Sequence, residues 1–116
     1  MKHFLNIDEI SSKEILKIIK TSHKLKKNYG KIYLKKKKIL GMIFEKPSTR
    51  TRVSFEVGIK QMGGDVVVLD QNDSQLGRGE SLNDTVKVLS SYVDVIMYRG
   101  KEEKIYMKSA RFLLFQ

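Results

Sequence analysis

Three short apolar runs, separated by segments with helical periodicity, constrain the fold of this chain more than any other feature. The runs span residues 38–44, 65–70 and 93–98. Because they are almost continuous in apolar residues, they predict strands that are buried on both faces, as in parallel sheets covered by helical crossovers. The order of helix and strand, repeated three times, therefore predicts an α/β fold with three layers, a parallel sheet with helices on both faces.

Caps and breakers set the boundaries of the predicted helices. The helices are expected over residues 12–27, 48–62 and 81–92. A serine stands at the start of each one, at Ser11, Ser48 and Ser81, and a serine hydroxyl accepts well from the first free N–H groups of a helix. Glu14 has the spacing that completes a capping box with Ser11. The polar segment 71–80 contains two glycines and is predicted to be a loop that could close over a ligand.

Composition narrows the classes of function. The 116 residues suit one small domain, and the absence of cysteine, which excludes thiolate chemistry, agrees with a cytoplasmic location. No apolar run approaches the roughly 20 residues that span a bilayer, so no membrane association is expected. Eleven lysines lie between Lys13 and Lys38 in a chain of net charge +10. This block favours a solvated helix face, with nucleic-acid binding as the alternative.

A cluster of hydroxyl and guanidinium groups follows the first predicted strand. Its residues, within about one helical turn, are Ser48, Thr49, Arg50, Thr51 and Arg52. Ligands of open α/β sheets bind at the carboxyl ends of strands, and a helix N-terminus there offers unpaired N–H groups and a partial positive charge. Arg50 adds a planar fork that suits phosphate oxygens. The alternative is that Ser48 only caps the helix and the arginines are solvated.

Arg99 ends the third predicted strand, so it is expected at the same edge of the sheet as Arg50, where the two could clamp one anion. The chain has neither of the glycine-rich nucleotide signatures, and the phosphate is therefore predicted to belong to a small molecule. His3 and His23 have no companions at metal-ligand spacing. No metal or cofactor is expected.

Residues 44–56, which read FEKPSTRTRVSFE, resemble the carbamoyl-phosphate signature of the aspartate and ornithine carbamoyltransferases. Further matches follow in the family's order, at residues 62–64, 75–77, 79–81, 84–85 and 94–99. Lys46, and Gln75 where the aspartate enzymes have Lys, are similar to the ornithine enzymes. The resemblance implies transfer of a carbamoyl group from carbamoyl phosphate to L-ornithine, giving L-citrulline and phosphate, in arginine metabolism.

The resemblance also implies roles for individual residues. Carbamoyl phosphate would be bound by Ser48, Thr49, Arg50, Thr51, Gln75 and Arg99, and the catalytic set would be Arg50, Thr51 and Arg99. In the family, the position of Gln75 reaches its ligand across a subunit boundary of a homotrimer. Some ornithine enzymes carry Lys where this chain has Gly79, so that charge is missing here.

The resemblance fades after Gly100. It predicts a partial, incomplete carbamoyl-phosphate-binding domain over residues 1–100 and a divergent C-terminal tail over residues 101–116. The family's carbonyl-polarising His and its ornithine domain have no counterpart in the sequence. We therefore expect a truncated product or fragment that is inactive alone. An aspartate-type carbamoyltransferase fragment and a basic nucleic-acid-binding module remain the alternative interpretations.

Overall fold

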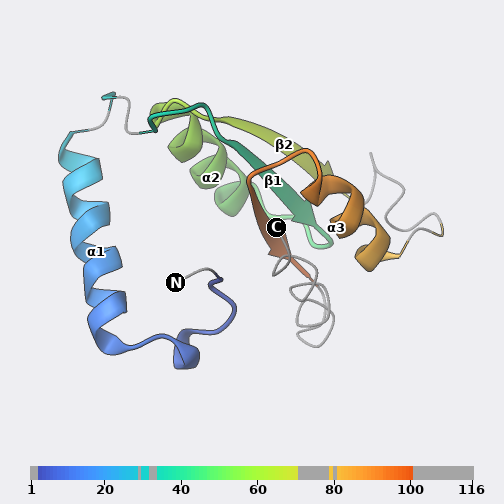
Figure 1. Cartoon of the computed structure of the whole chain (residues 1–116), viewed down its shortest axis with the longest axis horizontal. Helices are drawn as coiled ribbons and strands as arrows, with labels where there is room; N and C mark the ends of the chain where they lie inside the picture. The colour runs from blue at the N-terminus through green and yellow to red at the C-terminus, as the bar shows by residue number, and fades with distance from the viewer. Residues whose placement is uncertain (1–2, 29, 32–33, 71–78, 80, 101–116) are drawn as a thin grey trace. The chain divides into compact units, whose positions relative to one another are not determined.

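A computed structural model describes residues 3–28, 30–31, 34–70, 79 and 81–100 of the chain. The chain divides into two compact units, residues 1–31 and 32–116, and each is described by itself (Figure 1). Among the described residues, no helix has the length and apolar character needed to cross a membrane.

The first unit contains a short 3-10 turn, Ile7–Glu9, and helix α1, Ser12–Lys27. The predicted capping box is present, because the Ser11 hydroxyl accepts from the backbone N–H of Glu14 and the Ser11 N–H donates to the Glu14 carboxylate, both at 3.3 Å. The helix ends at Lys27, and its C-cap residue, Asn28, donates from its side chain to the Lys24 carbonyl at 2.9 Å. The prediction of a helix over residues 12–27 is thus confirmed.

The described part of the second unit is a three-stranded parallel sheet with two helices. The strands are β1 (Ile39–Phe44), β2 (Asp65–Asp70) and β3 (Val95–Arg99), in the spatial order β2-β1-β3, and the helices are α2 (Thr49–Gln61) and α3 (Leu82–Ser90). Both strand pairs are parallel, and the middle strand, β1, is also the most deeply buried. The predicted α/β fold with helices on both faces is confirmed (Figure 1).

Alternate residues of β1 build two separate cores. Leu40, Met42 and Phe44 pack on one face with Ile59 of α2. On the other face, Ile43 packs with Leu82, Val86 and Leu89 of α3. This division follows from the two-residue period of a strand, and it fixes α2 and α3 to opposite faces.

Gly41 of β1 faces Leu89 of α3 and Val93. A Cβ atom at this position would stand 2.9 Å from Leu89 Cδ2 and 3.1 Å from Val93 Cγ2, closer than packed carbon atoms approach. The helix therefore packs against bare backbone at this point.

Several predicted boundaries were wrong by one or two residues. Strand β1 begins at Ile39 instead of residue 38, and β3 is Val95–Arg99 instead of 93–98. Helix α2 is Thr49–Gln61 instead of 48–62, and α3 is Leu82–Ser90 instead of 81–92. The backbone N–H groups of Tyr92 and Val93 both donate to the Leu89 carbonyl, so the chain turns tightly before the strand begins. The predicted loop over residues 71–80 lies outside the described residues, apart from Gly79.

Candidate anion-binding site

The carboxyl ends of the three strands lie level with one another. Phe44 of β1 pairs with Asp70 of β2 on one side and with Arg99 of β3 on the other. The strand order reverses direction at β1, since the chain passes from β1 outward to β2 and then back across to β3. A reversal of this kind leaves a crevice at the carboxyl ends, where open α/β sheets bind ligands.

Thr51 and Arg99 meet at this edge. The Arg99 guanidinium donates to the Thr51 hydroxyl at 2.9 Å, across 48 residues of sequence. The backbone of Arg99 is also bonded at this edge, because the N–H of Glu45 donates to the Arg99 carbonyl at 2.8 Å. Thr51, on the first turn of α2, and Arg99, at the end of β3, are therefore side by side.

Ser48 differs from the serines that cap the other two described α-helices. Ser11 and Ser81 each accept a hydrogen bond from the N–H three residues on, at 3.3 Å and 3.2 Å. The Ser48 side chain makes no such bond within the described structure, although it stands at the same position of α2. The hydroxyl and the first N–H groups of α2 are therefore open to an anion, which the partial positive charge of the helix terminus favours.

A cavity of about 540 Å³ opens at this terminus. Its lining consists of Phe44, Glu45, Lys46, Pro47, Ser48, Thr49, Arg52, Val53 and Asp70. The two carboxylates of the lining have partners: Glu45 accepts from the Tyr98 hydroxyl at 2.7 Å, and Asp70 lies 3.9 Å from the Arg52 guanidinium. The acids are thus engaged by the protein itself.

The cations at this edge are less engaged. Arg50 and Lys46 are exposed, and neither forms an ion pair with another described residue. Lys46 lines the cavity, and Arg50 stands on the same turn of α2 as Thr49 and Thr51. Cations outnumber acids at this edge, with Lys46, Arg50, Arg52 and Arg99 against Glu45 and Asp70, so its local charge is positive and suits an anion.

Five of the six residues predicted to bind ligand are described. Ser48 and Thr49 line the cavity, Arg50 and Thr51 continue the same helical turn, and Arg99 reaches that turn from β3. Gln75 lies outside the described residues. Sequence reasoning missed Glu45, Tyr98 and the Arg52–Asp70 pair. The sequence held one signal for these residues, which is their position. Glu45, Asp70 and Tyr98 lie at or beside predicted strand ends, and Arg52 lies on the predicted helix that carries Arg50.

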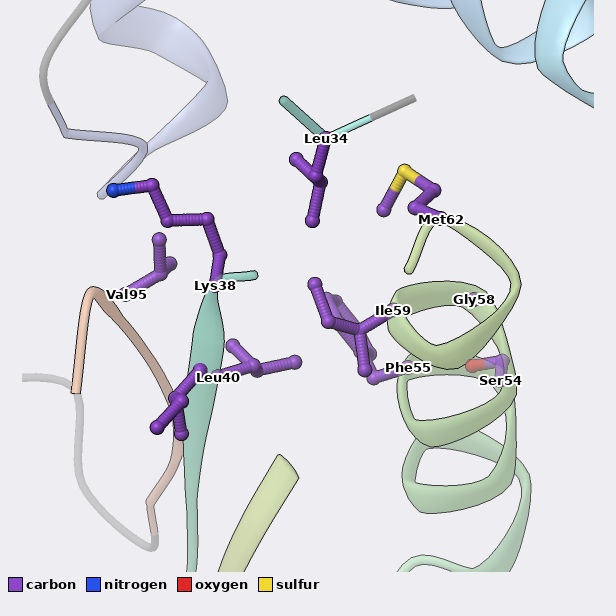
Figure 2. Close-up of a pocket in the computed structure, with 10 residues that line it drawn as sticks. Leu34, Lys38, Leu40, Ser54, Phe55, Gly58, Ile59, Met62 and Val95 are labelled. Carbon is purple, nitrogen blue, oxygen red and sulfur yellow. The ribbon is translucent and has the colours of Figure 1, made fainter. Parts of the chain in front are cut away.

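A second cavity of similar volume, about 540 Å³, lies between α2 and β1 on the side of the sheet where the strands begin (Figure 2). Figure 2 shows Leu40, Phe55 and Ile59 converging in it. Its lining is apolar apart from Lys38 and Ser54, so it lacks the chemistry of an anion site. Among the described residues, no cluster of His, Asp or Glu side chains could hold a metal ion.

Comparison with known families adds an independent observation. Residues 2–112 match the family described as "Aspartate/ornithine carbamoyltransferase, carbamoyl-P binding domain". The match runs past Gly100, so the predicted boundary there stays a prediction, and the tail itself lies outside the described residues.

The chain is similar to curated proteins named ornithine carbamoyltransferase. It is 47% identical over 116 residues to the one from Campylobacter curvus, covering 97% of this chain and 38% of the relative. It is 51% identical over 106 residues to the one from Helicobacter hepaticus, covering 88% and 32%. The chain thus spans less than two fifths of the length of these relatives.

Solved structures agree. The anabolic ornithine carbamoyltransferase from Campylobacter jejuni superposes with a TM-score of 0.86 at 42% identity, over 97% of this chain and 37% of that one. The catalytic subunit of M. jannaschii aspartate transcarbamoylase gives a TM-score of 0.82 at 36% identity, over 97% and 38%. Both acceptor types therefore share the fold seen here.

Proposed function

The chain belongs to the aspartate/ornithine carbamoyltransferase family, and we propose that it supplies the carbamoyl phosphate half of an ornithine carbamoyltransferase site. In the complete reaction, carbamoyl phosphate and L-ornithine give L-citrulline and phosphate. The observation that carries the proposal is the Arg99–Thr51 hydrogen bond of 2.9 Å at the open N-terminus of α2. This hydrogen bond brings a guanidinium from the end of β3 beside the hydroxyl of Thr51 on the first turn of α2.

The chemistry needs orientation and charge stabilisation. A neutral amine attacks the carbonyl carbon, so negative charge grows on the carbonyl oxygen and then on the leaving phosphate. Thr51 and Arg99 would donate to the carbonyl oxygen, since both are donors and both lie at the strand edge. Removing one donor of this kind typically costs about 3–4 kcal/mol of transition-state stabilisation.

The phosphate would bind at the N-terminus of α2. Arg50 is a planar cation with no ion pair among the described residues, and the Ser48 side chain forms no cap bond there. Thr49 lines the same cavity. Together with the first N–H groups of the helix, these side chains offer several donors to a phosphate, which has oxygen acceptors on all sides.

Ornithine is the proposed acceptor, because the similar curated proteins cited above carry that name and because of Lys46 and Gln75. The chain spans 38% of the Campylobacter curvus relative, so we propose that the acceptor site corresponds to the part of that relative that this chain does not match. We also propose a cytoplasmic homotrimer acting in arginine metabolism, with Gln75 reaching a neighbouring subunit.

Titration calorimetry of the 116-residue chain with carbamoyl phosphate tests the proposed binding. The proposal is supported if carbamoyl phosphate binds saturably and inorganic phosphate is only a weak competitor. Absence of binding contradicts it. The same titration with mixed-sequence DNA at low and high salt tests the alternative, because a nucleic-acid-binding module would bind DNA with a steep salt dependence.

A citrulline assay tests whether this chain supplies only the carbamoyl phosphate half of the site. The chain alone is expected to form no citrulline at saturating carbamoyl phosphate and ornithine, because the amine is not oriented, and orientation contributes up to about 7–11 kcal/mol. Turnover that copurifies with the chain would contradict this. Replacing ornithine by aspartate in the same assay tests the aspartate-type alternative.

A further inference from the structure

Glu45 places a carboxylate beside the cavity that is proposed to hold a phosphate. It is half-buried, it lines the cavity, and it directly follows the last residue of β1. An uncontrolled negative charge at that position would repel the ligand. Two contacts hold it to β3: its carboxylate accepts from the Tyr98 hydroxyl at 2.7 Å, and its N–H donates to the Arg99 carbonyl at 2.8 Å.

We propose that Tyr98 is a positioning residue for the anion site, acting through Glu45. Its hydroxyl draws the Glu45 carboxylate toward β3, so that this charge stays clear of the bound phosphate. The same bond fixes the beginning of the segment that leads from β1 to Ser48. This inference rests on the proposed function, because it assumes that carbamoyl phosphate occupies the cavity.

The fold makes Tyr98 a firm anchor. It pairs with Ile43 in the parallel register, and its side chain packs against the core between the sheet and α3. Its neighbour Arg99 lies on the opposite face, where it reaches Thr51 of α2. Two adjacent residues of one strand, on opposite faces of the sheet, thus act on the site: Arg99 supplies a donor, and Tyr98 restrains an acid.

The other acid of the cavity follows the same logic with a different partner. Asp70 lies 3.9 Å from the Arg52 guanidinium, which carries a charge of its own. Glu45 instead accepts a hydrogen bond from the neutral hydroxyl of Tyr98. The Tyr98 hydroxyl therefore holds the carboxylate by a hydrogen bond and itself brings no positive charge to the site.

Three variants test the inference by calorimetric titration with carbamoyl phosphate. Tyr98→Phe removes only the hydroxyl, and we expect about tenfold weaker binding, the size expected for losing one hydrogen bond to a charged group. The double variant Tyr98→Phe with Glu45→Gln is expected to regain most of that loss, because the freed group is then uncharged. Tyr92→Phe is the matched control, since Tyr92 is 75% exposed, and it should bind like the unaltered chain.

The double variant shows whether Tyr98 acts by restraining the Glu45 carboxylate or only by packing in the core. If Tyr98 only supported the fold, Glu45→Gln would restore nothing, and that result overturns the inference, as does unchanged affinity in Tyr98→Phe. If Tyr98→Phe fails to fold by circular dichroism, Glu45→Gln alone decides: binding equal to or tighter than normal supports a restrained acid, and loss of binding overturns it. Absence of binding by the unaltered chain overturns the proposed function and this inference with it.

Discussion

The two ends of the parallel sheet differ in how their charged side chains are paired. Where the strands begin, Lys37 pairs with Asp65 at 3.2 Å and Lys38 pairs with Asp94 at 2.9 Å. Where the strands end, Arg50 has no ion pair among the described residues, and the Ser48 side chain leaves the helix uncapped. The amino end pairs these cations with acids, whereas the carboxyl end pairs Arg52 with Asp70 but leaves Arg50 and Ser48 open in the described structure.

The amino end works as a clamp on β1. The Asp94 carboxylate accepts from the Ile39 N–H at 2.8 Å, and the Asp94 N–H donates to the Ile39 carbonyl at 2.9 Å. The Asp65 N–H donates to the Lys38 carbonyl at 2.9 Å. These bonds link β1 to both neighbouring strands, so the amino end can be rigid while the carboxyl end stays open to a ligand.

The largest expected effect concerns the open end. Arg50→Ala should weaken carbamoyl phosphate binding by 100-fold or more, on the order of 3 kcal/mol, because a charge-assisted contact to phosphate is lost. The melting temperature should not fall, since Arg50 is exposed and has no ion pair to lose in the described structure. Lys60→Ala is the matched control, because it removes the same charge from the far end of α2. Equal affinities for both variants would remove Arg50 from the site.

The next effect is expected at the clamped end, with the opposite signature. Asp94→Ala leaves the Ile39 N–H without its acceptor and frees Lys38. We expect the melting temperature to fall by roughly 5 °C with unchanged affinity for carbamoyl phosphate. Asp8→Ala, which removes an exposed acid from the first unit, is the control and should not alter the melt. An intact melt with weakened binding in Asp94→Ala would mean that the two ends are coupled.

The fold was predictable because its signals are local. The continuous apolar run in β1 and the glycine pair after α2 mark elements by composition and period alone. The position of Arg99 at the edge that also carries the cluster after β1 was predicted, because strand ends of a parallel sheet share one edge; its hydrogen bond is to Thr51, whereas Arg50 was the partner expected for an anion clamp. The Tyr98–Glu45 bond did not follow, because it joins residues 53 apart and depends on the register of β1 against β3. Periodicity does not determine that register.

The clamp should also respond to pH. The backbone N–H of Ile39, and then Lys38, lower the pKa of Asp94 from its ordinary value of 3.8, and the N–H of Val66, and then Lys37, do the same for Asp65. Because the pKa is lower in the folded state, the unfolded chain binds more protons near pH 4. The stabilisation is therefore complete above about pH 5 and is lost as the pH falls through 3.8 and below.

A double variant isolates that contribution. Asp65→Asn with Asp94→Asn should show a flatter dependence of melting temperature on pH between about 5 and 3 than the unaltered chain. The difference should be modest, because both carboxylates are partly exposed, at 50% and 36%, and solvent screens their ion pairs. Parallel profiles for the two proteins would show that other acids govern unfolding in acid.

The smallest effect on stability distinguishes the serines that cap helices. Ser81→Ala removes a hydroxyl that accepts from the Asp84 N–H at 3.2 Å, and it should cost about 1 kcal/mol of folding free energy. Ser48→Ala removes a hydroxyl without a cap bond in the described structure, so it should change that free energy by less than about 0.5 kcal/mol. The same variant should weaken carbamoyl phosphate binding about tenfold, because the anion loses a donor. Chemical denaturation and calorimetry of both variants measure the two quantities separately. If Ser48→Ala costs as much stability as Ser81→Ala, the hydroxyl caps α2 in solution, and the N-terminus of that helix is closed in the absence of ligand.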